Sequence, residues 1–339
     1  MNYHKSSTID YEFKIKDILK KLPSFCKDFI RHIEPVTEVR TRLAYISDIQ
    51  FFFNYLVIEN INDLDSIKNI TIEYLNNLTS NDFYDYLEYL KLYKSDGKII
   101  SNDNPARKRK LISIRALFKH LLKQKLINNP SIDLVSIPKL KDKTITTLDE
   151  NEIKDLLNLL YTGNGLTDSE LKYYKKTKYR DIALFTLLLG TGIRVSECVG
   201  LNISDIDFNN MRIRIIRKGG NEAFVYFGED TKNALFDITE NKDKNLPLFV
   251  SLQGTRMTVR SIEKLVKKYC SKISIKKISP HKLRSTFGTS LYNKTGDIYL
   301  VAEILGHRDV NTTKKHYAAM NEEKKKEAAN IMNITNFDN

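Results

Sequence analysis

The chain has 339 residues, 41% of them hydrophobic, with no run long enough to cross a bilayer and no apolar signal-peptide core after Met1. The length fits two domains, and the three scattered cysteines, Cys26, Cys198 and Cys270, match no metal spacing, which predicts buried, reduced thiols and a cytoplasmic location. The net charge of +13 favours a polyanionic partner.

The first 134 residues predict an N-terminal extension followed by a helical domain. Residues 1–22 are polar and only partly periodic, and suggest at most one helix. Across residues 23–134 apolar side chains recur at helical spacing. Thr37 and Asp82 are candidate helix caps, and Asp96-Gly97 is a candidate helix end.

The last helix of this domain, expected from about Ala106 to Lys125, has one apolar face and one basic side. The basic residues are Arg107, Lys108, Arg109, Lys110, Arg115 and Lys119. Most charge runs are solvated helix faces. Here the charges are nearly all of one sign and lie opposite a full apolar stripe, so we favour a helix that contacts phosphates.

Residues 135–146 predict a linker, because they are basic, contain Pro138 and have no period. A second domain is expected over residues 147–320, and its first helix follows the capping-box pattern Thr147-Leu-Asp-Glu150. Residues 163–180 are polar and rich in Lys and Tyr, which indicates a loop or a short helix. Residues 181–189 are apolar, as in a buried helix, and lead into the turn Gly190-Thr-Gly192.

The apolar pattern then changes from helical to alternating. Residues 206–208, 211–216 and 223–227 have this pattern, and Asn209-Asn210 and Gly219-Gly220 supply turns, which predicts a three-stranded antiparallel sheet. Helices are expected again at about 231–240, 258–272, 281–293, 297–305, 309–318 and 321–333. The fold class is therefore mainly α with a small three-stranded antiparallel β-sheet.

Six side chains of the second domain suit phosphoryl transfer without a metal. A phosphodiester under attack needs its oxygen charge balanced, its nucleophile positioned and its leaving oxygen protonated. Arg194, after the glycine turn, and Arg284 are candidates for the first task, because a guanidinium holds two phosphate oxygens and keeps its charge. Arg194 also suits a plain ion pair with Glu197. Lys218, at the expected hairpin, is the candidate acid, although a hairpin lysine is more often a solvated tip.

Two histidines and a late tyrosine complete this set. His281 lies three residues before Arg284 and so on the same helix face, and His307 follows a glycine at a helix boundary. Either histidine alone is more often structural. Tyr317 is a candidate covalent nucleophile, whose phosphotyrosine would keep the energy of the broken bond. Metal-dependent chemistry needs a carboxylate cluster, and Asp205 and Asp207 are better explained as turn residues.

These motifs, in this order, resemble the tyrosine recombinases of the phage-integrase family, and among them the bacterial Xer group. The resembling segments are Gly190-Thr-Gly-Ile-Arg194-Val-Ser-Glu197, His281-Lys-Leu-Arg284-Ser-Thr-Phe287 and Leu305-Gly-His307-Arg-Asp-Val-Asn-Thr-Thr313 followed by Tyr317. The hairpin Arg217-Lys218-Gly-Gly-Asn221 matches less tightly, and its register also permits Arg217. Ser285 stands where many members have histidine. The length of the extension and of the 163–180 insertion resembles the single-recombinase, XerS-like branch.

The resemblance implies a helical DNA-binding domain joined to a catalytic domain, with no cofactor or metal. Tyr317 would form a 3′-phosphotyrosyl link, Arg194 and Arg284 would hold the phosphate, and Lys218 would protonate the leaving 5′ oxygen. His281 and His307 would orient the phosphate and assist proton transfer. The partners implied are double-stranded DNA with paired sites and three further copies of the chain. Strands would be exchanged through a Holliday junction, and residues 321–339 would dock on a neighbouring subunit.

The resemblance to the Xer group implies chromosome-dimer resolution as the biological role, and other functions compete with it. An integrase of a mobile element would use the same chemistry, and one sequence does not separate the two. A type IB topoisomerase-like enzyme shares the active-site logic but not the separate helical domain. A non-catalytic DNA-binding accessory protein, or a helical scaffold, would not need all six side chains. The sequence identifies neither the DNA site nor an activating partner.

Overall fold

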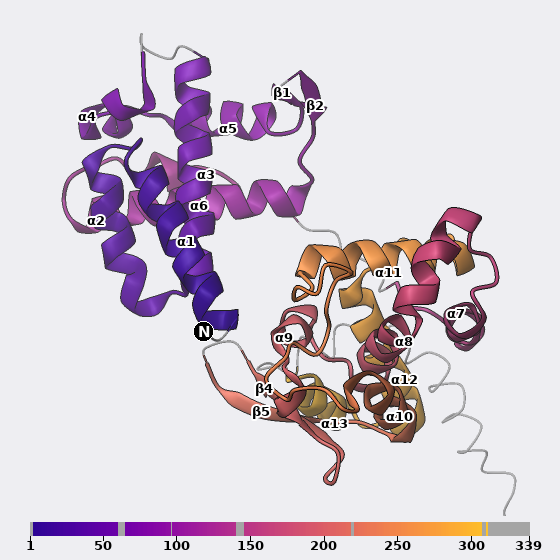
Figure 1. Ribbon diagram of the computed structural model, residues 1–339. Helices are drawn as coiled ribbons and strands as arrows, with labels where there is room; N and C mark the ends of the chain where they lie inside the picture. Colours follow the sequence, from indigo (N-terminus) through magenta and orange to yellow (C-terminus); the bar gives the residue numbers. More distant parts are fainter. Residues whose placement is uncertain are drawn as a thin grey trace, which may run out of the picture. The chain divides into compact units, whose positions relative to one another are not determined.

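The chain divides into two compact units, residues 1–142 and 143–339, in the computed structural model (Figure 1). The structure describes residues 3–59, 65–95, 97–139, 146–217, 220–306 and 310. The division falls inside the segment 135–146 expected to be a linker, of which 140–145 lie outside the described residues. The expected helices at 309–318 and 321–333 and the exchanged tail also lie outside them, apart from residue 310.

Unit 1 is helical with one small hairpin. Its helices are α1 (Tyr3–Leu19), α2 (Ser24–Ile33), α3 (Val39–Ile58), α4 (Ile72–Asn76), α5 (Ser80–Tyr89) and α6 (Asn104–Lys123), and its strands are β1 (Tyr93–Ser95) and β2 (Lys98–Ile100). Short 3-10 turns lie at Glu34–Val36, Ile67–Asn69 and Ser131–Leu134. The extension expected to form at most one helix is α1, which packs against α3.

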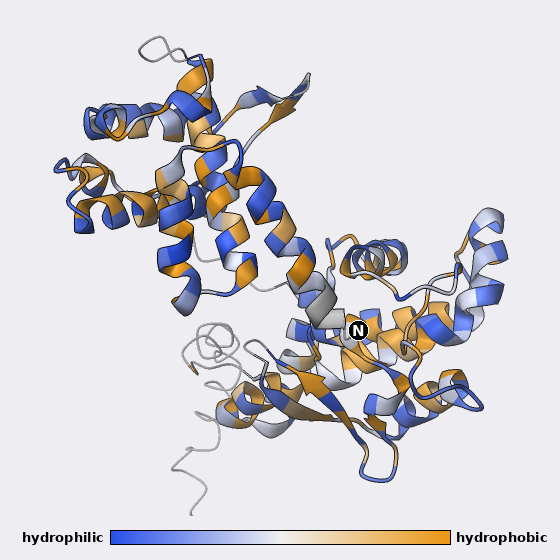
Figure 2. Cartoon of the chain, turned by 60° about the vertical axis from the view of Figure 1, so that its left-hand side comes forward, coloured by the Kyte–Doolittle hydropathy of each residue, from blue (hydrophilic) through white to orange (hydrophobic). Residues whose placement is uncertain are grey.

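The core of unit 1 forms where α3 packs against α6. Ile46, Ile49, Phe52 and Phe53 of α3 are fully buried, at the helical spacing expected from the sequence. The apolar stripe of α6, Leu111, Ile114, Leu117 and Leu121, is also fully buried. In Figure 2 hydrophobic and hydrophilic residues succeed one another along the helices, as in amphipathic helices packed around a core.

Local details of unit 1 differ from those expected. Glu38 precedes α3 as its N-cap, whereas the Thr37 hydroxyl donates back to the Ile33 carbonyl, 2.6 Å away. Asp82 is the third residue of α5 and forms a capping box with Thr79, the true N-cap. The segment around Gly97 forms the β1–β2 hairpin instead of a helix end. Gly97 has φ of +73°, which suits the two-residue turn between the paired residues Ser95 and Lys98.

Unit 2 is mainly helical with one three-stranded sheet. Its helices are α7 (Glu150–Thr162), α8 (Asp168–Thr191), α9 (Val195–Gly200), α10 (Glu229–Thr239), α11 (Val259–Ile273), α12 (Pro280–Thr295) and α13 (Ile298–Leu305). Its strands are β3 (Ile206–Asp207), β4 (Arg212–Ile216) and β5 (Glu222–Tyr226), which follow the 3-10 turn Ile203–Asp205. The strands pair antiparallel in the order β3-β4-β5, so the expected fold class is confirmed. Ile213, Ile215 and Val225 of the sheet are buried.

The expectation of a loop or short helix at 163–180 is wrong. Gly163, with φ of +76°, ends α7, and a capping box of Thr167 and Glu170 starts α8. From Asp168 one helix of 24 residues runs to Thr191 and includes the polar stretch. Tyr174 is buried and donates to the Leu160 carbonyl over 3.1 Å. The polar residues lie on exposed positions of a long amphipathic helix, which low hydrophobicity alone does not exclude.

The apolar second half of α8 is the centre of unit 2. Residues 182–188 are all buried, and α10 and α12 both pack against this helix. α12 in turn packs against α13. Cys198 and Cys270 in this unit and Cys26 in unit 1 are free and buried, as expected. No helix in the described part of the chain is long and apolar enough to cross a membrane.

Glu152 ties the start of α7 to the segment between α11 and α12. Its carboxylate accepts from Lys276 Nζ over 2.6 Å and from the Asp149 backbone N–H over 2.9 Å. Ser274 Oγ donates to its other oxygen over 2.5 Å. Burial acts to raise the pKa of this carboxyl, but the hydrogen bonds outweigh it and lower the pKa to about 2.

We expect Glu152→Gln to lower the free energy of unfolding at pH 7 by about 1–2 kcal/mol. The folded-state pKa is depressed, so this contribution is full above the ordinary value of 4.5 and is lost as the pH falls toward 2. Urea unfolding at pH 7, 5 and 3.5 should show the gap between wild type and variant narrowing at low pH. Glu150→Gln, exposed on the same turn, is the control. If the difference in unfolding free energy between wild type and Glu152→Gln stays constant with pH, the ionised carboxylate is not its source.

Candidate active site

Three arginine side chains meet at the C-terminal end of α13. The carbonyls of Ile304, Leu305 and Gly306 each accept a hydrogen bond from a different guanidinium. The last carbonyls of a helix have no partner within it and carry the negative end of the helix dipole, so they attract cations. Gly306 closes the helix with φ of +61°, a conformation that side-chain-bearing residues rarely adopt.

Arg284 comes from α12 and is only 6% exposed. Its Nη1 donates to the Gly192 carbonyl, and its Nη2 donates to the Leu305 carbonyl. Gly192 has φ of +61° and lies so close to Phe287 that an added Cβ would stand 2.5 Å from that ring. The glycine turn after α8 is therefore needed both for its backbone conformation and for room beside α12.

Arg194 is the N-cap of α9 and pairs with Glu197 one turn later. Its backbone N–H and its Nη1 each donate to a Glu197 carboxylate oxygen over 2.9 Å. Its Nη2 donates to the Gly306 carbonyl over 3.0 Å. The Arg194 side chain is 37% exposed, whereas the Glu197 side chain is 5% exposed. The buried carboxylate thus holds a cation that still faces solvent, so the ion pair considered from sequence exists and aims the guanidinium.

Arg217 directly follows β4 and supplies the third guanidinium. Its Nη2 lies 3.4 Å from the Ile304 carbonyl oxygen. A Cβ on Gly306 would lie 2.2 Å from Arg217 Nη1 and 2.4 Å from its Cζ. The guanidinium therefore rests on the bare Cα of Gly306. Sequence reasoning noted Arg217 only as another register for the hairpin lysine, and no local pattern signals its contact with a glycine 89 residues away.

Of the remaining expected site residues, the structure describes only His281. His281 is exposed in the first turn of α12, one turn before Arg284. Lys218, His307 and Tyr317 lie outside the described residues. His307 nevertheless follows Gly306 in sequence, and Lys218 follows Arg217. The structure thus brings Arg194 and Arg284 together and adds Arg217 to them.

This end of unit 2 has the charge of an anion-binding site. Three guanidiniums converge on this helix end, and one of them, that of Arg194, pairs with the Glu197 carboxylate, so these four side chains together carry two positive charges. Guanidiniums stay protonated at any ordinary pH and match the oxygens of a phosphate in geometry. Within the described residues no group of three or more His, Cys, Asp or Glu side chains is arranged to hold a metal ion.

The basic side of α6 in unit 1 is largely used within that unit. Asp48, 2% exposed, accepts from Arg109, from Lys110 over 3.4 Å and from Ser113 over 2.8 Å. Lys110 is itself buried and lies over the Phe51 ring at 4.0 Å. This interior position does not fit the expected contact between Lys110 and a phosphate.

Other expected phosphate contacts of α6 also have internal partners. Arg107 donates to the Leu87 carbonyl over 3.1 Å, and Arg115 donates to the Ile132 carbonyl over 3.2 Å and to that of Val135. Lys119 is exposed and Lys108 is partly exposed. These two lysines are the members of the expected set that remain available to a ligand on this face.

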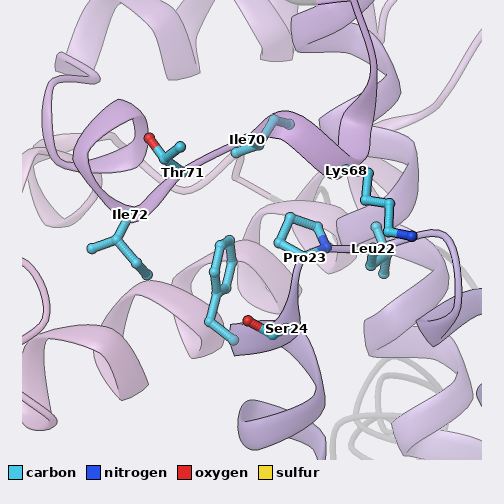
Figure 3. A pocket seen from close by; sticks show the side chains of 8 residues that line it. Leu22, Pro23, Ser24, Lys68, Ile70, Thr71 and Ile72 are labelled. Carbon is cyan, nitrogen blue, oxygen red and sulfur yellow. The ribbon is translucent and has the colours of Figure 1, made fainter.

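A pocket of about 360 Å³ lies elsewhere in unit 1, between the start of α2 and the segment before α4 (Figure 3). Leu22, Pro23, Ser24 and Phe25 line one side, and Lys68 and residues 70–72 line the other. None of the expected site residues lines it. Its walls carry one charged side chain, that of Lys68, and no cluster of polar groups.

The described residues form a mainly helical fold with a two-stranded and a three-stranded antiparallel sheet. Three guanidiniums that converge on one helix end are chemically suited to a phosphate. The family model described as the phage integrase family matches residues 146–324, which is more than half of the chain. The chain is 31% identical over 330 residues to the tyrosine recombinase XerC of Caldanaerobacter subterraneus subsp. tengcongensis, covering 91% of this chain and 87% of that protein. The chain therefore belongs to the phage integrase family, the tyrosine recombinases, and the resemblance seen in its sequence is confirmed.

One further relative is similar in sequence, and two solved structures share the fold. The tyrosine recombinase XerS of Lactococcus lactis subsp. cremoris is 28% identical over 320 residues, covering 85% of this chain and 89% of that protein. The fold is shared with the XerH site-specific recombinase bound to a palindromic difH substrate (TM-score 0.59, 22% identity, 86% and 79% coverage). It is also shared with the Tn1549 transposon integrase in complex with a circular intermediate DNA (TM-score 0.62, 19% identity, 89% and 99% coverage).

We expect Gly306→Ala to destabilise unit 2 by about 1–2 kcal/mol through its backbone conformation, with a further loss because Arg217 must move. In an Arg217→Ala background only the backbone cost should remain, which leaves a coupling of about 1 kcal/mol in the double-mutant cycle. Urea unfolding of the four proteins measures this coupling.

Gly254→Ala provides the control for that cycle. Gly254 also has positive φ, +74°, but nothing lies within 4 Å of its added Cβ. Its substitution should cost the same in both backgrounds. Additivity at Gly306 would mean that the guanidinium does not rest on that glycine.

Proposed function

We propose that this enzyme is a site-specific DNA recombinase that cuts and rejoins DNA through a 3′-phosphotyrosyl intermediate, with Tyr317 as the nucleophile. The observation that carries the proposal is the convergence of Arg194 and Arg284 on the last turn of α13, immediately before His307 in the chain. Membership of the tyrosine recombinases supports it.

Each step of the proposed reaction has a group suited to it. Arg194 and Arg284 bind the non-bridging oxygens of the scissile phosphate and balance the charge that grows during attack. The Tyr317 oxygen bonds to phosphorus and its proton passes to a base, while the bond to O5′ breaks and Lys218 gives that oxygen a proton. His281 and His307 orient the phosphate and assist proton transfer. The new phosphodiester keeps the bond energy, so attack by a 5′ hydroxyl reverses the step without a cofactor.

The proposed partner is double-stranded DNA. The XerH and Tn1549 structures are complexes with DNA, and the fold they share with this chain supports the same class of ligand. Unit 1 would contribute a phosphate-contacting surface through Lys108 and Lys119 of α6. We infer a homotetramer on two sites, strand exchange through a Holliday junction, and docking of residues 321–339 on a neighbouring subunit.

Two biological roles remain candidates. Similarity to XerC and XerS proteins over at least 85% of this chain favours the chromosome-dimer resolution inferred from sequence. The fold shared with a transposon integrase favours integration or excision of a mobile element as the second candidate. Both roles use the same chemistry and differ in the DNA site. Outside these two roles, a non-catalytic DNA-binding accessory protein is a further alternative.

The test is covalent trapping on nicked duplexes, in which loss of a short strand prevents religation. Candidate sites from the host chromosome and from flanking mobile elements are incubated with the protein in chelator, and adducts are mapped by peptide mass. We expect an adduct at Tyr317 that Tyr317→Phe abolishes, and the DNA that yields it identifies the biological role. Binding without any adduct would sink the proposal in favour of the accessory protein.

Lys119→Ala should weaken DNA binding and reduce the slope of log affinity against log salt by about 0.9, because one phosphate contact is lost. Its thermal midpoint should not change, because the side chain is exposed. Arg115→Ala should instead lower the stability of unit 1, since two backbone carbonyls lose their donor. Lys91→Ala, exposed in the same unit and paired with Glu88, is the control. If the slope for Lys119→Ala is unchanged, DNA does not contact α6 at this residue.

A further inference from the structure

The root of the β4–β5 hairpin is fixed one residue beyond its strands. The strand pairing ends at Ile216 and Glu222, but the Arg217 backbone N–H still donates to the Asn221 carbonyl over 2.8 Å. The Arg217 carbonyl accepts from the Gly220 N–H over 3.1 Å. Arg217 is thus the last residue on the β4 side whose backbone is held by the ladder before the segment that carries Lys218.

The side chain of Arg217 joins this root to α13. Its guanidinium lies on Gly306 without room for a Cβ between them, and its Nη2 reaches the Ile304 carbonyl oxygen at 3.4 Å. Its Nε is buried and has no hydrogen-bond partner among the described residues. Packing against the glycine is therefore part of what holds this side chain in place.

The same turn of α13 also receives the two arginines proposed to hold the phosphate. Arg284 donates to the Leu305 carbonyl and Arg194 to the Gly306 carbonyl. The root of the hairpin and the two proposed phosphate ligands, Arg194 and Arg284, are therefore anchored to the same short backbone segment. A shift of that turn would move all three side chains together.

We propose that Arg217 is a positioning residue, which fastens the root of the β4–β5 hairpin to the last turn of α13 and so aligns Lys218 with the phosphate held by Arg194 and Arg284. The proposal rests on the proposed function. Lys218 lies outside the described residues, but it directly follows Arg217 in the sequence, so the chain that leads to it starts from a fixed residue.

Arg217 itself is unsuited to the proton transfer. A guanidinium does not lose its proton at the pH where enzymes work, whereas a lysine ammonium does so readily. A direct role as a third phosphate ligand is the main competitor, because the charge of Arg217 lies beside the other two guanidiniums. The two roles separate chemically, because a positioning residue for the acid matters only when the leaving oxygen needs a proton.

A substrate with sulfur in place of O5′ at the scissile phosphate tests this separation. Attack by Tyr317 then breaks a P–S bond and releases a thiolate, which is stable without an added proton. The DNA is the nicked duplex that yields the Tyr317 adduct, prepared with oxygen or with sulfur at that position. Single-turnover cleavage rates and binding constants are measured for both forms with the full chain.

We expect Arg217→Ala to cleave the oxygen substrate roughly 10- to 100-fold more slowly than wild type, since small misplacements of catalytic groups cost this much. On the sulfur substrate its rate should return to within about threefold of wild type, a margin smaller than the loss being tested. DNA affinity should change little, and Arg217→Lys should restore part of the oxygen rate. Lys218→Ala should show a larger loss and the same rescue.

Two variants complete the comparison. Arg214→Ala, on the same strand and paired with Asp205 and Glu222, should cleave both substrates like wild type. Arg284→Lys should be slow on both, because it weakens the hold on the phosphate. One outcome would overturn the positioning role. If sulfur restores the rate of Lys218→Ala but Arg217→Ala stays slow on the sulfur substrate, then Arg217 is a phosphate ligand. If neither is rescued, the acid role of Lys218 fails, and the positioning role fails with it.

Discussion

The site depends on which groups donate hydrogen bonds to the last carbonyls of one short helix, α13. The last carbonyls of α13 would ordinarily bond to water or to the turn that follows. Here they accept from Arg194, Arg217 and Arg284, which come from the start of α9, the end of β4 and the body of α12. Because charged donors from three different elements satisfy these carbonyls, the helix end both joins those elements and frames the proposed active site.

Positive charge in this protein serves two different purposes. On α6 of unit 1, Arg109 and Lys110 compensate the buried Asp48, and Arg115 caps the carbonyls of a 3-10 turn. In unit 2 three guanidiniums converge on the carbonyls at the end of α13, and together with the Glu197 carboxylate that pairs with Arg194 these four side chains carry two positive charges. A net charge of +13 does not distinguish the two uses, because only the position of each partner decides whether a cation remains available to DNA.

Much of this arrangement follows from sequence, and the remainder fails for identifiable reasons. The local spacing of apolar residues predicts the mainly helical fold, the three-stranded sheet and the buried faces of α3 and α6. Residues 181–189 are helical, as their apolar pattern predicts, but the polar residues 168–180 before them hide the first half of the same helix, whose start depends on the capping box at Thr167. The internal duties of Lys110 and Arg115, and the contact between Arg217 and Gly306, join residues far apart in the chain, which no local pattern records.

The absence of a side chain at position 306 limits which substitutions can accumulate at this position and at position 217 during evolution. Arg217 occupies the volume that any Cβ at this position would need. A lineage that acquires a larger residue there must first give up the arginine, and an arginine can arise at position 217 only where the glycine already stands. The dependence between these positions, 89 residues apart, runs one way, because the φ of +61° still favours glycine at 306 after the arginine is lost. An arginine at position 217 is therefore expected only in homologues that keep glycine at position 306.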